Sequence, residues 1–298
     1  MKLSNPVQFI DRTSGKLVTE SVMGDKALRF AYETLLGHCI SGLLFNSSAL
    51  SSLLGKYYDS RFSKKSINSL ASIPGCMPQE AELPLEEYKS FNDFFTRRLK
   101  PGSRPFCNDA NSIASPADGR IMVYENLQDL DAIPVKGAKR TLNDLCANLL
   151  NKNSYAAAVI RLAPVDYHRY HYPCACVQTA ETVKLKGKYH SVNPVALAAN
   201  PDVYVENARH ITELDSEVFG RFYFLEVGAF GVGSINSTSG VGMHNLQDEK
   251  GYFKFGGSTV ILVFENSSIQ WDSDLLENTL AGKETLIRCG MQIAKKRV

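Results

Sequence analysis

The chain has 298 residues, of which 44% are hydrophobic and 21% charged, a composition typical of a folded globular protein. Its net charge is +2, and no cluster of Lys and Arg is interleaved with aromatic residues, so no nucleic-acid partner is expected. Seven cysteines without a secretory signal predict reduced thiols and a cytosolic protein. No run approaches the roughly 20 apolar residues that cross a bilayer.

Residues 1–105 are predicted to form a helical front, after a short β-like stretch and a polar turn within residues 1–24. From Asp25 to about Leu54, apolar residues recur every three or four positions, which predicts two helices separated near residues 45–48. A linker rich in Pro and Gly follows. Another helix is then predicted from Leu85 to Leu99.

The segment between Asp25 and about Ser66 has two interpretations. It is either a helical hairpin packed on the rest of the protein or an element that lies at a membrane interface. The second interpretation depends on a small, uncharged polar face and on the cations that follow it, which could meet anionic headgroups. These cations are Lys56, Arg61, Lys64 and Lys65.

Residues 106–298 change to a pattern of short strands bounded by Gly, Pro, Asn or Asp. Only residues 142–150 and 194–200 look helical in between. The sequence therefore predicts an α+β protein, with a helical region at 1–105 and a mostly antiparallel β-sheet catalytic body at 106–298. The expected strands are Arg120–Tyr124, Ala156–Leu162, Cys176–Val183, Arg221–Val227, Gly231–Asn236 and Thr259–Glu265.

The first candidate for chemistry is the stretch Gly256-Gly257-Ser258-Thr259, which runs directly into the apolar strand. Glycine allows backbone conformations that other residues avoid and lets another group approach the main chain. The hydroxyl of Ser258 is therefore placed where a flexible turn meets a rigid element. Taken alone, this pattern favours an ordinary turn before a strand.

The second candidate is the pair His168 and His171, which lie three residues apart among aromatic side chains. They could act in acid–base catalysis, form a structural pair, or bind a metal together with Cys174 and Cys176. The spacing does not match a zinc motif, so no metal is predicted. Asp118, in a Pro/Gly turn before a strand, is either a turn residue or the acid that orients a histidine.

Six segments, in this order and with this spacing, resemble the phosphatidylserine decarboxylase family over about residues 91–264. Each segment is weak by itself, and their combination is highly specific. They are FNDFFTRRLKPGSRP (91–105), SPADGRI (115–121), DYHRYHYP (166–173), SVNP (191–194), EVGAFGVGSI (226–235) and FKFGGSTVILVFE (253–265).

The resemblance implies a proenzyme that cuts itself between Gly257 and Ser258, leaving chains 1–257 and 258–298 held together. Ser258 then becomes a pyruvoyl group, the covalent cofactor. The family's Asp/His/Ser set falls on Asp118, His171 and Ser258, and the histidine of the decarboxylation step falls on His168.

The implied reaction converts phosphatidylserine to phosphatidylethanolamine and CO₂ through a Schiff base between the pyruvoyl group and the substrate amine. Because the substrate is a bilayer lipid, the resemblance also implies a peripheral protein on the cytoplasmic face of the cell membrane. A homodimer is a possible assembly. The chain departs from the family pattern at Gly256, where many members have Leu, and at Ala208, where the usual residue is Glu.

Three other functions remain open from the residues. A serine hydrolase would use the same three residues on an external ester or amide and keep its chain intact. A non-catalytic lipid-binding protein would retain only the fold. A pyruvoyl decarboxylase for a soluble amino acid would act without dispersed lipid.

Overall fold

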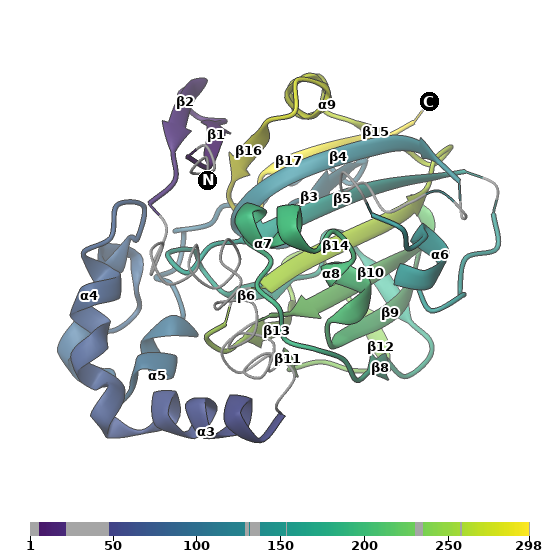
Figure 1. Cartoon of the computed structure of the whole chain (residues 1–298). Coiled ribbons are helices and arrows are strands. Elements are labelled where there is room, and N and C mark those ends of the chain that lie inside the picture. The colour runs from purple at the N-terminus through teal and green to yellow at the C-terminus, as the bar shows by residue number, and fades with distance from the viewer. Residues whose placement is uncertain are drawn as a thin grey trace.

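The computed structural model describes residues 6–21, 48–128, 131, 138–152, 154–229, 235–256 and 258–297, with only the backbone for 48–52. The helix predicted after Asp25 and the residue Gly257 lie outside these ranges, as does most of the strand predicted at 231–236, of which Ile235 and Asn236 are described. The described part is a mixed α/β structure with a large, mostly antiparallel sheet and few helices (Figure 1).

The large sheet contains eleven described strands, in the order β12-β7-β9-β10-β14-β5-β4-β16-β1-β2, with β8 paired to β9. Only the pairing of β1 with β16 is parallel among them. The strands are β1 (Gln8–Asp11), β2 (Lys16–Thr19), β4 (Gly119–Leu127), β5 (Tyr155–Leu162), β7 (Cys176–Gln178), β8 (Val183–Leu185), β9 (Arg209–Ser216), β10 (Gly220–Gly228), β12 (Gly242–His244), β14 (Ser258–Glu265) and β16 (Glu284–Ile287).

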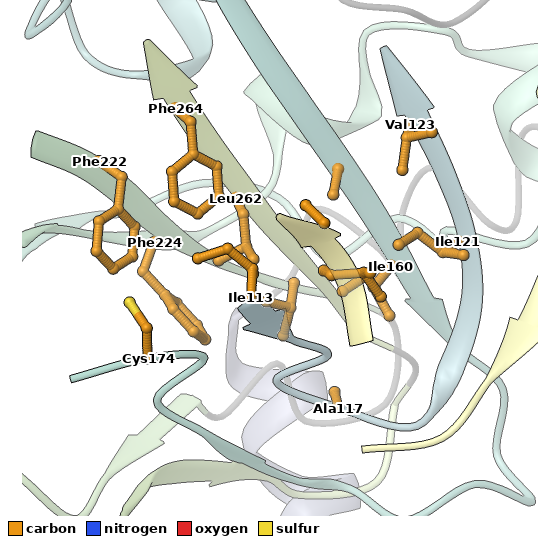
Figure 2. Close-up of a cluster of buried hydrophobic side chains, with 14 of the residues drawn as sticks. Ile113, Ala117, Ile121, Val123, Ile160, Cys174, Phe222, Phe224, Leu262 and Phe264 are labelled. Atoms are coloured by element: carbon orange, nitrogen blue, oxygen red, sulfur yellow. The ribbon is translucent and has the colours of Figure 1, made fainter. Parts of the chain in front are cut away.

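One face of the large sheet packs against two three-stranded sheets. The first has the order β11 (Ile235–Ser237), β13 (Glu249–Phe253), β6 (Arg169–His171), and the second the order β15 (Ile269–Trp271), β17 (Gln292–Lys296), β3 (Ser112–Ala114). Figure 2 shows the core between these layers, where Phe222 of β10 stacks on Phe264 of β14 at 4.8 Å between ring centroids.

The opposite face of the large sheet is covered by short helices (Figure 1). These are α6 (Leu142–Leu145), α7 (Pro194–Ala199) and α8 (Val203–Glu206), while α9 (Ser273–Leu280) packs on β4. Strand β14 is therefore buried on both faces, with Val260 and Leu262 in one core and Ile261 and Val263 in the other. This double burial explains why its sequence is a continuous apolar run and does not alternate with polar residues.

The helices before residue 100 form a separate group with its own aromatic core (Figure 1). They are α3 (Ser48–Asp59), α4 (Ile67–Ala71), α5 (Phe91–Phe95) and the 3₁₀ turns η1 (Arg61–Ser66), η2 (Pro78–Glu80) and η3 (Leu85–Glu87). Phe255, close before Ser258 in the chain, packs against Phe91 and Phe95 of this group. The helical region thus directly contacts the segment that leads to Ser258.

Three predicted elements were wrong in extent. The helix expected over 85–99 is broken, because Ser90 is extended and its hydroxyl accepts the Asp93 amide, so that α5 begins only at Phe91. The helix expected over 142–150 ends at Leu145, since Ala147 and Asn148 take positive φ angles of 54° and 61°. The strand expected over 176–183 is split into β7 and β8.

Candidate active site

The chain passes twice between the large sheet and the small sheet of β6 and β13, from β5 to β6 and from β13 to β14. These two connections together form the crossing. Ser258, the first residue of β14, lies opposite Leu162, the last residue of β5. At the other side of the crossing, the Phe253 amide donates to the His168 carbonyl at 2.9 Å. The histidine-containing turn and the segment leading to Ser258 therefore border each other.

Ser258 lies inside the sheet between β5 and β10, opposite Leu162 on one side and Gly228 on the other. Its side chain has no exposed surface, and its Oγ has no hydrogen-bond partner among the described residues. Leaving a buried hydroxyl unbonded costs about 1–3 kcal/mol, and a catalytic role is one of the explanations for such a group. This hydroxyl is the candidate nucleophile.

His168 is completely buried, and its ring lies 3.9 Å from that of Phe95 between centroids. Its Nδ1 is 3.0 Å from the Asp166 carbonyl, which can only accept, so the ring proton of the neutral imidazole is on Nδ1. The Nε2 lone pair has no partner among the described residues. Burial lowers the pKa of His168 to about 3, which makes it neutral at physiological pH.

His171 lies at the end of β6, partly exposed. Its Nδ1 donates to the Gln247 carbonyl at 2.8 Å, and its Nε2 is 3.3 Å from the Tyr167 hydroxyl, which donates to it. Burial lowers the pKa of His171 as well. The ring lines an open cavity of about 490 Å³ together with Arg104.

Asp118 is buried just before β4, where Arg104 donates to both of its carboxylate oxygens, from Nε at 2.8 Å and from Nη2 at 2.6 Å. The Cys289 amide donates a further bond at 2.8 Å. The Asp118 charge opposes the lowering of the pKa at both His168 and His171, so all three groups share one electrostatic environment. Arg104 and the Cys289 amide orient this carboxylate.

The structure gathers Asp118, His168 and His171 into one region and places Ser258 at the same crossing as His168. Among the described residues, however, no hydrogen bond joins Asp118 to His171 or either of them to Ser258. The catalytic set inferred from the sequence therefore stays a prediction. Cys174 (Figure 2) and Cys176 are buried in the hydrophobic core. No described cluster of three or more His, Cys, Asp or Glu could hold a metal.

Sequence reasoning did not identify Asn207, which supports the strand opposite Ser258. Its buried amide group donates to the carbonyls of Gly228 and His190, both at 2.8 Å. The adjacent Ala208 contributes its main chain, since its carbonyl accepts the Gly228 amide at 2.9 Å. This backbone bond does not depend on the side chain, so it is compatible with Ala in place of the family's Glu.

The missed partners differ in the signal that could have identified them. Arg104 and Tyr167 lie within two of the motif segments and were not assigned a role. Gln247 and Cys289 act through main-chain groups, so their residue types give no signal of these hydrogen bonds. A serine hydroxyl, two histidines and an aspartate are the residue types that enzymes use to activate a serine.

Comparison with known proteins identifies the class more closely. The family model for phosphatidylserine decarboxylase matches residues 91–295, and the chain belongs to this family. Relatives described as phosphatidylserine decarboxylase proenzyme include one from Clostridium novyi, 40% identical over 93% of this chain and 95% of its own length. A relative from Clostridium botulinum is 38% identical over 98% of this chain and 100% of its own length. One from Chlamydia muridarum is 36% identical over 97% of each chain.

Proposed function

We propose that the chain is a phosphatidylserine decarboxylase proenzyme, which cuts itself between Gly257 and Ser258 and then releases CO₂ from phosphatidylserine to give phosphatidylethanolamine. The observation that carries this proposal is the buried, unpartnered hydroxyl of Ser258 at the start of β14, at the same crossing as the unpartnered Nε2 of His168. Family membership and the description of the relatives as proenzymes support it.

In the cleavage step, the Ser258 oxygen attacks the carbonyl carbon of Gly257, and the peptide C–N bond breaks to leave an ester. The proposed base is the Nε2 of His171, with Asp118 as the nearby carboxylate. Loss of the α-proton of Ser258 together with the ester carboxylate gives dehydroalanine. Water then replaces its nitrogen, which leaves as ammonia, and a pyruvoyl group results.

The residues around Ser258 fit such a group. Hydrogen bonds to β5 and β10 hold β14 on both sides, so the new chain terminus stays in place. The group supplies a ketone that takes up the substrate amine and accepts the electron pair released with CO₂. His168 is the proposed proton donor, because its Nε2 has no partner among the described residues and its turn borders the segment that leads to Ser258.

The proposal is tested by the mass of the purified protein under denaturing, reducing conditions and by CO₂ release from detergent-dispersed phosphatidylserine. Two fragments with a pyruvoyl start at position 258 and lipid-dependent CO₂ release are expected. An uncut chain that a fluorophosphonate labels at Ser258 would instead favour a serine hydrolase, and lipid binding alone a non-catalytic protein. CO₂ release only from a soluble amino acid would change the substrate class.

We also propose that the protein docks peripherally on the cytoplasmic face of the cell membrane through α3 and η1. Leu53 and Phe62 expose 64% and 67% of their surfaces there, and Tyr57 exposes 40%. Exposed cations, among them Lys56 and Lys65, flank them and would meet anionic headgroups. No helix among the described residues is long and apolar enough to cross a membrane.

Phe62→Ser is expected to weaken binding to vesicles that contain phosphatidylserine by roughly 10-fold, because burying a large apolar side chain is worth about 1.5–3 kcal/mol. Cosedimentation with vesicles measures this. The control is Leu280→Ser, which removes a leucine that is 80% exposed on α9. Equal vesicle binding by the two variants would move the docking surface elsewhere.

A further inference from the structure

Arg97 carries a buried positive charge without a carboxylate partner. Its surface is 3% exposed, yet no ion pair joins it to any described acidic residue. Its nearest acceptors are main-chain carbonyls at long distances, namely Phe94 at 3.4 Å and Val165 and Asp166 at 3.3 Å. The Nε atom has no partner at all among the described residues.

Other buried arginines of this protein are better satisfied. Arg104, Arg120 and Arg161 each form ion pairs with carboxylates. Arg209 resembles Arg97 in bonding only carbonyls, but its Nε and Nη2 each lie 3.0 Å from one, and its Nη1 also contacts one closely. Since a buried charge is costly unless it is paired and hydrogen-bonded, Arg97 has unused capacity for an anion.

Arg97 also lines a cavity of about 260 Å³ between the N-terminal hairpin and the turn before His168. The carboxylates that line the cavity are already engaged. Asp118 binds Arg104, Asp166 binds Arg120, Glu20 binds Arg161, and Asp11 accepts hydrogen bonds from Thr13 and Ser14. Of the four arginines that line the cavity, Arg104, Arg120 and Arg288 each form an ion pair, whereas Arg97 forms none with a described acidic residue. A site with this charge and volume suits a small anionic group.

The cavity borders the candidate active site. Arg97 Nη2 and His168 Nδ1 share one acceptor, the Asp166 carbonyl, at 3.3 Å and 3.0 Å. An anion held by Arg97 would thus lie close to the imidazole. An opposite charge near a histidine favours its protonated form, the form in which His168 can donate a proton.

We propose that Arg97 and this cavity form a phosphate subsite, which binds the phosphodiester of a glycerophospholipid headgroup. This inference rests on the proposed function. Arginine's planar fork matches a phosphate in a bidentate manner. The phosphodiester keeps its charge throughout the reaction, whereas the carboxylate leaves as neutral CO₂. A cation on the carboxylate would therefore stabilise the substrate more than the transition state.

The test is isothermal titration of the purified protein with dihexanoyl phosphatidylethanolamine, a soluble product analogue whose binding requires no turnover. Arg97→Gln is expected to weaken this binding at least about 10-fold, with Arg97→Lys intermediate. Binding of phosphate-free dihexanoylglycerol should not change. The matched control is Arg209→Gln, which removes another buried arginine and should lower the melting temperature without selective loss of phospholipid binding. Should Arg97→Gln fail to fold, Arg97→Lys serves with the same measurements.

Competition by inorganic phosphate distinguishes the source of the anion. If inorganic phosphate displaces the phospholipid from the wild-type protein but not from the Arg97 variants, the subsite also accepts free phosphate. If phosphate displaces no phospholipid, the subsite requires the esterified headgroup. Unchanged affinity in both Arg97 variants would overturn the subsite. If wild type released CO₂ while the variants bound normally, the subsite would fall and the function would stand. If binding depended on Arg97 but the wild-type protein released no CO₂, the subsite would stand and the proposed function would fail.

Discussion

Ser258→Ala is expected to leave the chain uncut at 298 residues and to abolish CO₂ release from phosphatidylserine. Alanine lacks the oxygen that attacks the Gly257 carbonyl, and without cleavage no pyruvoyl group forms. The substitution should leave the fold intact, because the serine hydroxyl is buried without a hydrogen bond among the described residues. Removing it therefore breaks no described hydrogen bond and relieves an unsatisfied polar atom.

Intact mass under denaturing conditions and a CO₂ assay on dispersed lipid measure the two effects. Ser268→Ala is the matched control, since it removes a serine hydroxyl bonded to the Glu265 carbonyl in the turn after β14. This control should be cut and active. A Ser258→Ala protein that is both cut and active would disprove the proposed mechanism.

The second large effect separates the two histidines. His171→Ala is expected to remain uncut, because the proposed base for Ser258 is lost. His168→Ala is expected to be cut but to decarboxylate roughly 10²–10⁴-fold more slowly, the usual range for loss of a positioned acid or base. The reason is that His168 is the proposed donor to the substrate carbon that loses CO₂.

Chain masses and single-turnover CO₂ release on each variant measure these steps separately. His244→Ala is the control, because it removes another histidine ring, which stacks on Tyr172. The opposite pattern, with His168→Ala uncut and His171→Ala processed, would assign the cleavage base to His168. Its unpartnered Nε2 would then be the atom that takes the Ser258 proton.

The strands of the central sheet could be predicted because burial leaves a simple pattern in them. β5 and β14 are buried on both faces, and each contains a continuous apolar run, at 155–160 and 260–264. Pro194 marks the start of α7 as expected. The three-residue strands β6 and β12 carry no such pattern. They exist because neighbouring strands supply their hydrogen bonds, which a local sequence cannot reveal.

The candidate site was predictable as residues but not as contacts. The order of the motifs indicated Asp118, His168, His171 and Ser258. The partners that orient them depend on tertiary structure, as Arg104 reaches Asp118 across 14 positions and Cys289 across 171. Arg97 illustrates the same limit, since a cation in a helical motif looks like an ordinary helix-terminal residue until its burial is known.

The position of β14 has a consequence for how the two proposed chains are made and kept. Residues 258–298 would supply a central strand of the large sheet, the strand β16 beside β4, and the strands β15 and β17. These fragments could not separate without opening the sheet, so they would not exchange between molecules. Once denatured, they could reassemble only by a bimolecular reaction. Folding must therefore precede the cut. The uncut precursor folds as one chain, whereas its two products would have to find each other in order to refold.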